Sequence, residues 1–221
     1  SLSMPRAIEN SEKILIRDTW PTLLNRLFNC RSNIYNFPKR ARDSFTFSSD
    51  LINEAVKFIE PQFIILQVGI VDCSPRLFSN NEKRIIFCRL MPKSIQKHLI
   101  SYKKKISHTK NYNRYKVKVG EKDFSFNIES FINKIKTINK DIKIIIIPII
   151  GDLERLEESR RGYIKNIKNY NKILAIKSEN TVYLSDIFYE MNSNWFYKDG
   201  YHLSKFGHVK IAKIIYNYLN V

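Results

Sequence analysis

The sequence predicts an α/β protein whose parallel sheet is covered by helices on both faces. Three short segments are almost continuously apolar, as is typical of strands buried on both sides. Between these segments, apolar residues recur at helical spacing, so strands and helices alternate along the chain. The 221 residues contain no repeat and no shift in composition, and we expect one domain over residues 1–221.

The three predicted strands are short, and each is bounded by polar or turn-forming residues. They cover 63–68, 142–150 and 181–184. The first follows Pro61, and the second is interrupted by Pro148. Because helices separate them, we expect parallel pairing through right-handed crossovers.

The predicted helices are recognised from apolar stripes with a spacing of i, i+3, i+4 and i+7. The stripes run over Ile52–Ile59, Ile128–Ile135, Tyr163–Leu174 and Ile211–Tyr218, and a further helix is expected over Leu23–Phe28. Ser49 or Asp50, Asn127 and Ser204 precede three of these stripes and can cap the helices.

The chain carries a formal net charge of +17, which raises the question of a nucleic-acid partner. The lysines are spread along the chain rather than gathered in one segment, so we consider nucleic-acid binding unlikely. Residues 101–123 form a basic excursion, which we interpret as lying beside the substrate cleft, as a mobile loop, or as a solvated insertion without a role. An anionic substrate remains compatible with the charge.

Cysteine content and hydropathy indicate the expected location. Cys30, Cys73 and Cys88 are odd in number and lack metal-site spacing, which favours a reducing compartment. No apolar run is long enough to span a bilayer, and the chain does not open with a secretory signal pattern. We therefore expect a cytoplasmic protein without a membrane span; its oligomeric state is not predicted.

The sharpest chemical motif lies between the last strand and the last helix. Asp199 and His202 are three residues apart with Gly200 between them, so one short turn can hold both side chains together. A histidine base needs a carboxylate on one ring nitrogen, which fixes its tautomer and leaves the other nitrogen for the nucleophile. The simpler interpretation is that His202 only marks the start of a helix. His208 is expected to pack in the core, and His98 and His108 to lie on the surface.

These residues resemble a known family. Asp199-Gly200-Tyr201-His202-Leu203-Ser204, followed by Gly207-His208, resembles the last conserved block of the SGNH/GDSL hydrolases. The opening Ser1-Leu2 is similar to the end of the Gly-Asp-Ser-Leu turn, and Gly69-Ile70-Val71-Asp72 to the Gly-x-Asn-Asp block. The similarity is greatest to a branch associated with bacterial surface-polysaccharide loci.

The resemblance implies a three-layer α/β/α sandwich with a flavodoxin-like sheet. It also implies a serine esterase that removes an O-acyl group from a carbohydrate or another small ester, with Ser1 as nucleophile, His202 as base and Asp199 as its orienting carboxylate. It implies no cofactor and no metal. The alternative is a catalytically impaired or acyl-transferring relative that binds an anionic glycan.

The beginning of the chain departs from the family pattern. The Gly-Asp before Ser1 and the interior strand that should precede it are absent, and we expect that residues of the native protein come before Ser1. Alternatively, Glu12–Ile16 fills the place of that strand and brings Asp18-Thr19 to the turn. A third interpretation is that Ser1-Leu2 is a cloning remnant and the match is accidental.

The predicted substrate-binding groups follow the first and third strands of the family fold. Val71 replaces the asparagine that donates to the oxyanion, so backbone N–H groups near Ser1 and Gly69, or an arginine, must replace it. Pro5-Arg6 and Pro75-Arg76 place two guanidinium groups after neighbouring strands, where they can bind a carboxylate or phosphate. The alternative is that both are ordinary surface arginines. Asp72 either holds its loop or binds a sugar hydroxyl, with the structural role favoured, and Cys73 is expected to be a small buried residue.

Overall fold

The fold was analysed in a computed structural model, which describes residues 3–9, 12–39, 41–46, 56–78, 80–87, 91–107, 116–176 and 180–220. The strands are β1 (Arg6–Glu9), β2 (Glu12–Ile14), β3 (Phe63–Leu66), β4 (Lys143–Ile146) and β5 (Thr181–Tyr183). The longer helices are α1 (Trp20–Leu27), α5 (Asn80–Ile86), α6 (Lys93–Ser107), α7 (Glu121–Ile138), α8 (Leu153–Ser159), α9 (Tyr163–Leu174) and α11 (Lys205–Leu219). Short turns are η1 (Ile16–Asp18), α3 (Lys57–Ile59), α4 (Ile70–Cys73), α10 (Ile187–Glu190) and η3 (Ser193–Trp195).

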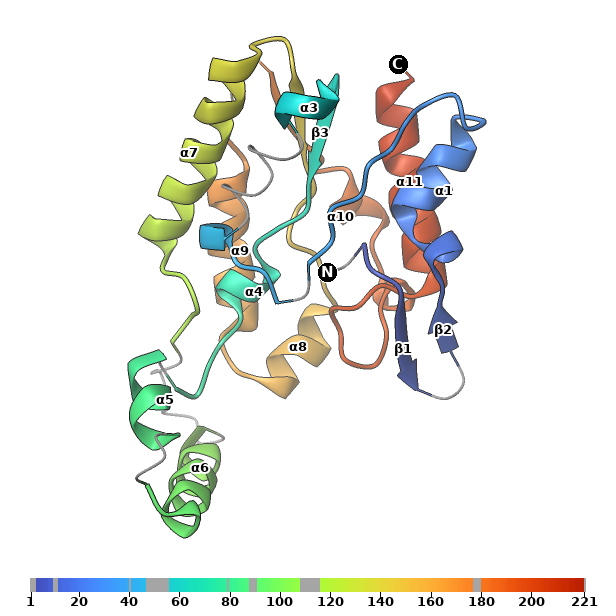
Figure 1. The fold of residues 1–221 in the computed structure, drawn as a ribbon. Coiled ribbons are helices and arrows are strands. Elements are labelled where there is room, and N and C mark those ends of the chain that lie inside the picture. The colour runs from blue at the N-terminus through green and yellow to red at the C-terminus, as the bar shows by residue number, and fades with distance from the viewer. Residues whose placement is uncertain are drawn as a thin grey trace.

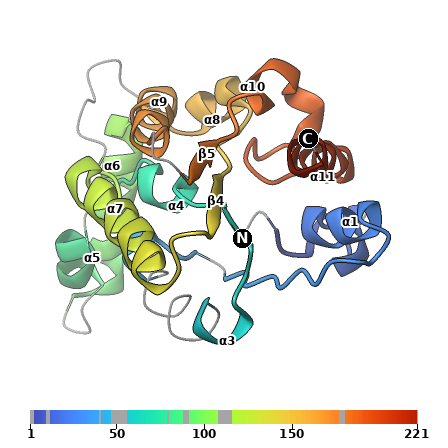
Figure 2. The same ribbon diagram turned by 90° about the horizontal axis from the view of Figure 1, so that it is seen from above.

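A three-stranded parallel sheet with the order β3-β4-β5 forms the centre of the molecule. Helices lie on both of its faces: α7 and α9 on one side, α1 and α11 on the other (Figures 1 and 2). Alternate residues of β4 enter the two cores, with Ile144 and Ile146 facing α7 and α9 and Ile145 facing α1 and α11. The predicted α/β class with a parallel sheet is therefore confirmed, and covering on both faces explains why the strands are continuously apolar.

The central strand is shorter than predicted. Strand β4 ends at Ile146, although the apolar run continues to Ile150. Pro148 has no N–H to offer a neighbouring strand, so the ladder cannot continue past it. Instead, the Asn171 side chain of α9 donates to the Ile149 carbonyl at 2.9 Å and accepts from the Ile149 N–H at 2.7 Å.

The N-terminal segment forms a separate two-stranded hairpin. Strands β1 and β2 pair antiparallel, with Arg6 opposite Ile14 and Ala7 opposite Lys13. The alternative in which Glu12–Ile16 enters the parallel sheet is therefore wrong, because only two residues separate the strands and such a short link favours a hairpin. Among the described residues, no strand pairs with the outer edge of β3.

Two predicted helices match closely, a third begins earlier than predicted, and a fourth lies only partly within the described residues. Helix α9 covers the predicted 163–174, and α11 begins after Ser204, whose hydroxyl accepts from the Gly207 N–H at 3.1 Å. Helix α7 begins at Glu121 rather than after Asn127, because the acidic residues in its first turn suit a helix start and buried Phe124 extends its apolar stripe. Of the helix predicted at 52–59, only 56–59 lies within the described residues.

The basic excursion predicted at 101–123 is not one loop. Its first residues belong to α6 and its last to α7, while 108–115 lie outside the described residues. Helices α5 and α6 project from the body of the molecule (Figure 1). Within the described part of the chain, no helix is both long and apolar enough to cross a membrane.

Candidate active site

The Asp199–His202 turn holds a carboxylate against a histidine ring. His202 Nδ1 lies 2.5 Å from Asp199 Oδ2. The other carboxylate oxygen, Oδ1, accepts hydrogen bonds from the backbone N–H groups of Tyr201 at 3.1 Å and His202 at 3.0 Å. The predicted hydrogen-bond contact between the two side chains is confirmed, and three bonds orient the carboxylate; its catalytic role stays a prediction.

The backbone of this turn is fixed at both ends. Phe196 and Leu203 form an antiparallel bridge, and the Tyr197 N–H donates to the His202 carbonyl at 2.8 Å. Gly200, at φ +79°, adopts a conformation that other residues rarely reach. Behind the turn, a Cβ on Gly207 would lie 2.3 Å from the Trp195 carbonyl oxygen, so α11 can approach this closely only with glycine there.

The loop after β4 supports the turn from the other side. The Asp152 N–H donates to the Gly200 carbonyl at 2.7 Å, and the Asp152 side chain caps α8 by accepting from the Arg155 N–H. Arg155 Nη1 reaches back to the Tyr197 carbonyl at 3.3 Å, and its Nε pairs with Asp152 at 3.1 Å. The dyad therefore lies at the carboxyl end of the sheet, where α/β proteins bind ligands.

The surroundings of the dyad favour an ionised carboxylate. Burial alone would raise the pKa of Asp199, but hydrogen bonds from the His202 ring and from two backbone N–H groups outweigh it and lower that pKa. The Tyr201 ring packs on the His202 ring, with 4.0 Å between ring centroids, and His202 is only 3% exposed. A charged acceptor next to a shielded imidazole is the arrangement that a histidine base requires.

His208 has a different role from His202. It is buried on α11, and its Nδ1 accepts a hydrogen bond from the Trp20 N–H at 3.1 Å. Burial lowers the pKa of His208 to about 4, with a small opposing effect from Asp18. His208 is thus a neutral packing residue that joins α1 to α11, as predicted. His98 is exposed, as predicted, and His108 lies outside the described residues.

The loop after β3 is built around Gly69 and Asp72. Gly69 has φ +105°, and a Cβ there would lie 2.4 Å from the Ile149 side chain. Asp72 is fully buried and accepts from the Ser44 N–H at 2.7 Å, while its carbonyl accepts from the Lys118 N–H at 3.0 Å. Asp72 therefore joins three distant segments, which agrees with the structural role favoured from the sequence.

The remaining predicted site residues divide into described and undescribed groups. Ser1 lies outside the described residues, and the same holds for the side chain of Arg6, whose backbone opens β1. Arg76 is half-buried after α4, and its backbone exchanges hydrogen bonds with Lys116 at 2.7 and 3.3 Å. Cys73 is buried, and burial followed by the charge of Asp72 raises the pKa of its thiol, so it remains protonated.

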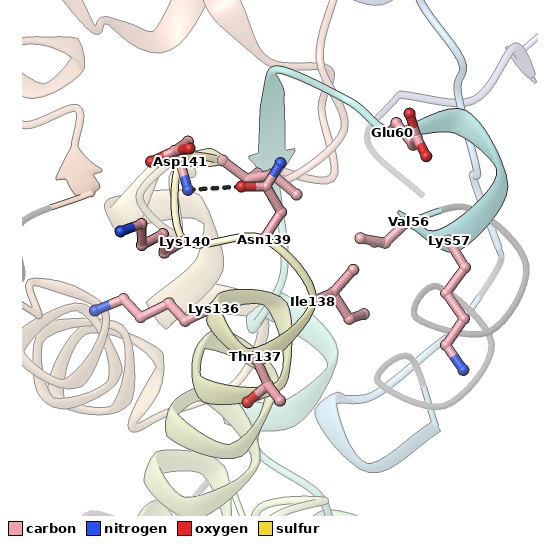
Figure 3. Close-up of a pocket in the computed structure, with 10 residues that line it drawn as sticks. Val56, Lys57, Glu60, Lys136, Thr137, Ile138, Asn139, Lys140 and Asp141 are labelled. Carbon is pink, nitrogen blue, oxygen red and sulfur yellow. Dashed lines mark hydrogen bonds between the residues drawn. The ribbon is translucent and has the colours of Figure 1, made fainter.

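A hollow lies elsewhere, between α3 and the end of α7 (Figure 3). Its lining includes Lys57 and Glu60 near α3, and Lys136, Lys140 and Asp141 around the α7–β4 connection. These segments precede β3 and β4, so the hollow lies at the amino ends of the strands, opposite the dyad. Binding sites of open α/β sheets lie at the other end, and we assign no role to this hollow.

Several supporting residues were not recognised from the sequence. Asn171 fixes the loop after β4, Arg155 connects that loop to the dyad turn, and Ser44 binds Asp72. Each of these contacts joins a side chain to a backbone group far away in sequence, and no local spacing reveals such contacts. Among the described residues, no group of three or more His, Cys, Asp or Glu side chains could hold a metal ion.

A scan against protein-family models finds no match to this chain, and a search of curated proteins likewise finds no significant match.

Proposed function

We propose that this protein is a serine hydrolase of the SGNH type that cleaves an ester, with an O-acylated carbohydrate as the favoured substrate. The observation that carries the proposal is the 2.5 Å contact between His202 Nδ1 and Asp199 Oδ2. A carboxylate at Nδ1 keeps the proton on that nitrogen, so Nε2 is the ring atom that accepts the proton of a nucleophile. The resemblance of the opening residues assigns the nucleophile to Ser1.

In the proposed reaction, the Ser1 hydroxyl gives its proton to His202 Nε2 as its oxygen bonds to the acyl carbon. The tetrahedral intermediate collapses with cleavage of the bond to the alcohol, which takes the proton from His202. Water then loses a proton to His202 and adds to the acyl carbon. Ser1 leaves with that proton, and a carboxylic acid is released.

The same proposal extends the fold to a three-layer, flavodoxin-like sandwich. Helices on both faces of β3-β4-β5 support it, as does the outer edge of β3, next to which the described residues place no strand. In the proposed arrangement, that edge is where the strand before the nucleophile belongs.

The oxyanion hole is the weakest part of the family resemblance. The side chain of Val71 on α4 cannot donate a hydrogen bond, and the loss of one such donor costs about 3 kcal/mol of transition-state stabilisation. Backbone N–H groups near Ser1 and Gly69 are the proposed replacement. Val71 is also the observation that favours the second candidate, a relative that is catalytically impaired or transfers the acyl group and binds an anionic glycan.

Labelling with a fluorophosphonate tests the hydrolase proposal. We expect covalent modification of Ser1, located by peptide mass spectrometry, and its loss in His202→Ala. His98→Ala is the matched control, because His98 is an exposed histidine on α6. If the wild-type protein is not modified by the fluorophosphonate but binds acidic glycans, the second candidate is favoured. If labelling persists in His202→Ala, the proposed base is wrong.

A further inference from the structure

Arg76 carries a half-buried positive charge after α4. Among the described residues, no side chain forms an ion pair with its guanidinium group, and no oxygen accepts a hydrogen bond from it. Its backbone is nevertheless fixed by the bridge to Lys116. A side chain held on a rigid backbone with an unmatched charge differs from an ordinary surface arginine, which extends freely into solvent.

A second arginine lies beside it. Arg160 follows α8, and its Nη1 donates to the carbonyl of Pro75 at 3.1 Å, the residue directly before Arg76. Burial lowers the pKa of Arg76, and the positive charge of Arg160 lowers it further. Two neighbouring guanidinium groups repel each other, and an anion between them removes that repulsion.

Three described acidic residues of this region already have partners. Asp43 pairs with Lys118 at 2.6 Å, and buried Asp72 accepts from the Ser44 N–H. Glu157 accepts the N–H groups of Gly162 at 2.7 Å and Ile164 at 2.9 Å at the start of α9. The acids that attract Arg76 from a distance, Asp43 and Asp72, thus leave the arginine pair with excess positive charge.

The arginine pair lies within reach of the dyad. Helix α8 connects the Asp152 loop, which contacts Gly200, to Arg160; its 7 residues correspond to about 10 Å. Tyr163 lies between the two sites: its hydroxyl bonds to Ser74 at 2.7 Å, and it interacts electrostatically with both Arg160 and Tyr201. Tyr201 in turn packs on His202. An oligosaccharide of a few glycosyl units is long enough to bridge such a separation.

We infer that Arg76 and Arg160 together bind the anionic group of an acidic carbohydrate, a carboxylate or a phosphate, whose acyl ester reaches His202. This inference rests on the proposed function for the role of His202, but the anion site itself does not require catalysis. Guanidinium groups suit it because each can form two parallel hydrogen bonds with a carboxylate or phosphate. Arg160 thereby takes the place beside Arg76 that the sequence assigned to Arg6, whose side chain is not described.

Binding is measured on wild-type protein, because none of the three probes carries an ester that the protein could hydrolyse. Glucuronate, inorganic phosphate and neutral glucose are titrated while the ¹⁵N-labelled arginine Nε–H signals are followed. We expect the Arg76 and Arg160 signals to shift with one or both anions but not with glucose, and the affinity to fall with added salt. The anion that binds more tightly identifies carboxylate or phosphate as the natural group.

Variants decide whether the pair acts together. Arg76→Gln and Arg160→Gln should each weaken binding about tenfold or more, because each removes a charged hydrogen-bond donor. Arg26→Gln, which removes an exposed arginine on α1, is the matched control and should bind as before. Equal affinity in all three variants, or no shift of either signal with any anion, would overturn the inference.

Kinetics separate this inference from the proposed function. With His202 intact, Arg160→Gln should raise KM for an ester of an acidic sugar and leave KM for a neutral ester of the same acyl group unchanged. An equal change for both esters contradicts the anion site while the hydrolase proposal survives. Anion binding that needs both arginines in a protein without esterase activity contradicts the hydrolase proposal instead.

Discussion

Asp199 and Asp72 both lie at the carboxyl end of the sheet, yet the structure gives these two carboxylates opposite properties. Asp199 is partly exposed, both of its oxygens accept hydrogen bonds, and its pKa is lowered. Asp72 is fully buried, its Oδ2 accepts no hydrogen bond from the described residues, and burial raises its pKa. The first environment favours a charge that can orient a histidine, while the second disfavours charge and serves packing.

The two buried histidines repeat this contrast. His202 has a carboxylate at Nδ1, whereas His208 accepts a backbone N–H at the same atom. Residue type and burial do not distinguish them, because both are buried histidines, one just before α11 and one on it. Only the group that each Nδ1 meets does so, and this difference can be altered experimentally.

Removal of the His202 ring should have the largest effect. His202→Ala is expected to reduce esterase turnover by at least about 10³-fold, because the proposed base and acid are lost together. Initial rates with a small acyl ester measure this, and circular dichroism checks that the variant folds. Turnover within a few-fold of that of His98→Ala would mean that His202 is not the base.

Removal of the Asp199 charge should have the second-largest effect on turnover. Asp199→Asn can still accept the Tyr201 and His202 N–H groups through its oxygen, but its amide no longer stabilises a charged imidazole, so a loss of about 10²–10⁴ in kcat is expected. Because the pKa of Asp199 is lowered by folding, its charge stabilises the native state above the unfolded pKa. This contribution disappears as the pH falls through the folded pKa.

Denaturation at several pH values checks this second effect. Wild type and Asp199→Asn should differ in unfolding free energy at neutral pH and converge in acid. A difference that is constant with pH would show that the substitution acts through packing rather than through charge.

His208 should control stability rather than turnover. Because its pKa is about 4 when folded and near 6.5 when unfolded, acid protonates the unfolded chain first. The protein should therefore lose about 3 kcal/mol of stability as the pH falls from 6.5 to 4. In His208→Asn, whose side-chain oxygen can accept the Trp20 N–H, urea unfolding should show a flatter profile in this window; an unchanged slope would contradict the assignment.

Substitution of Asp72 should have the smallest effect. The charge of Asp72 should lower the stability of the folded protein, whereas the charge of Asp199 should raise it. Since folding raises the pKa of Asp72, the folded protein loses stability as the pH rises from the unfolded pKa through the folded one. Asp72→Asn, which retains an acceptor for the Ser44 N–H, should thus melt a few degrees higher at pH 7 and no higher at pH 3. A lower melting temperature at pH 7 would show that the charge stabilises this loop.

Local patterns predicted much of this molecule, and distant contacts explain the remainder. Helix α9, the Ser204 cap and the Asp199–His202 contact depend on residues within one helix or turn, so spacing alone reveals them. The Asp72–Ser44 bond joins residues 28 apart, and the Arg160–Pro75 bond joins residues 85 apart. No periodicity encodes such pairs.

The high lysine content of one segment led to a wrong prediction of its secondary structure. Residues 101–107 were interpreted as part of a basic loop because of their lysines, yet they complete α6. Lysine is a good helix former, and one of these lysines, Lys103, pairs with Glu82 on α5 at 2.7 Å. The high lysine content therefore concealed a helix that its Ile95, Leu99 and Tyr102 spacing could have revealed.

The protonated nitrogen of each histidine tests the central claim most directly. Long-range ¹H–¹⁵N spectra of histidine-labelled protein at neutral pH report which ring nitrogen carries the proton. We predict the proton of His202 on Nδ1, facing Asp199, and the proton of His208 on Nε2, because its Nδ1 accepts from Trp20. If neutral His202 instead carries its proton on Nε2, that nitrogen cannot accept a proton from a nucleophile, and the proposed dyad is contradicted.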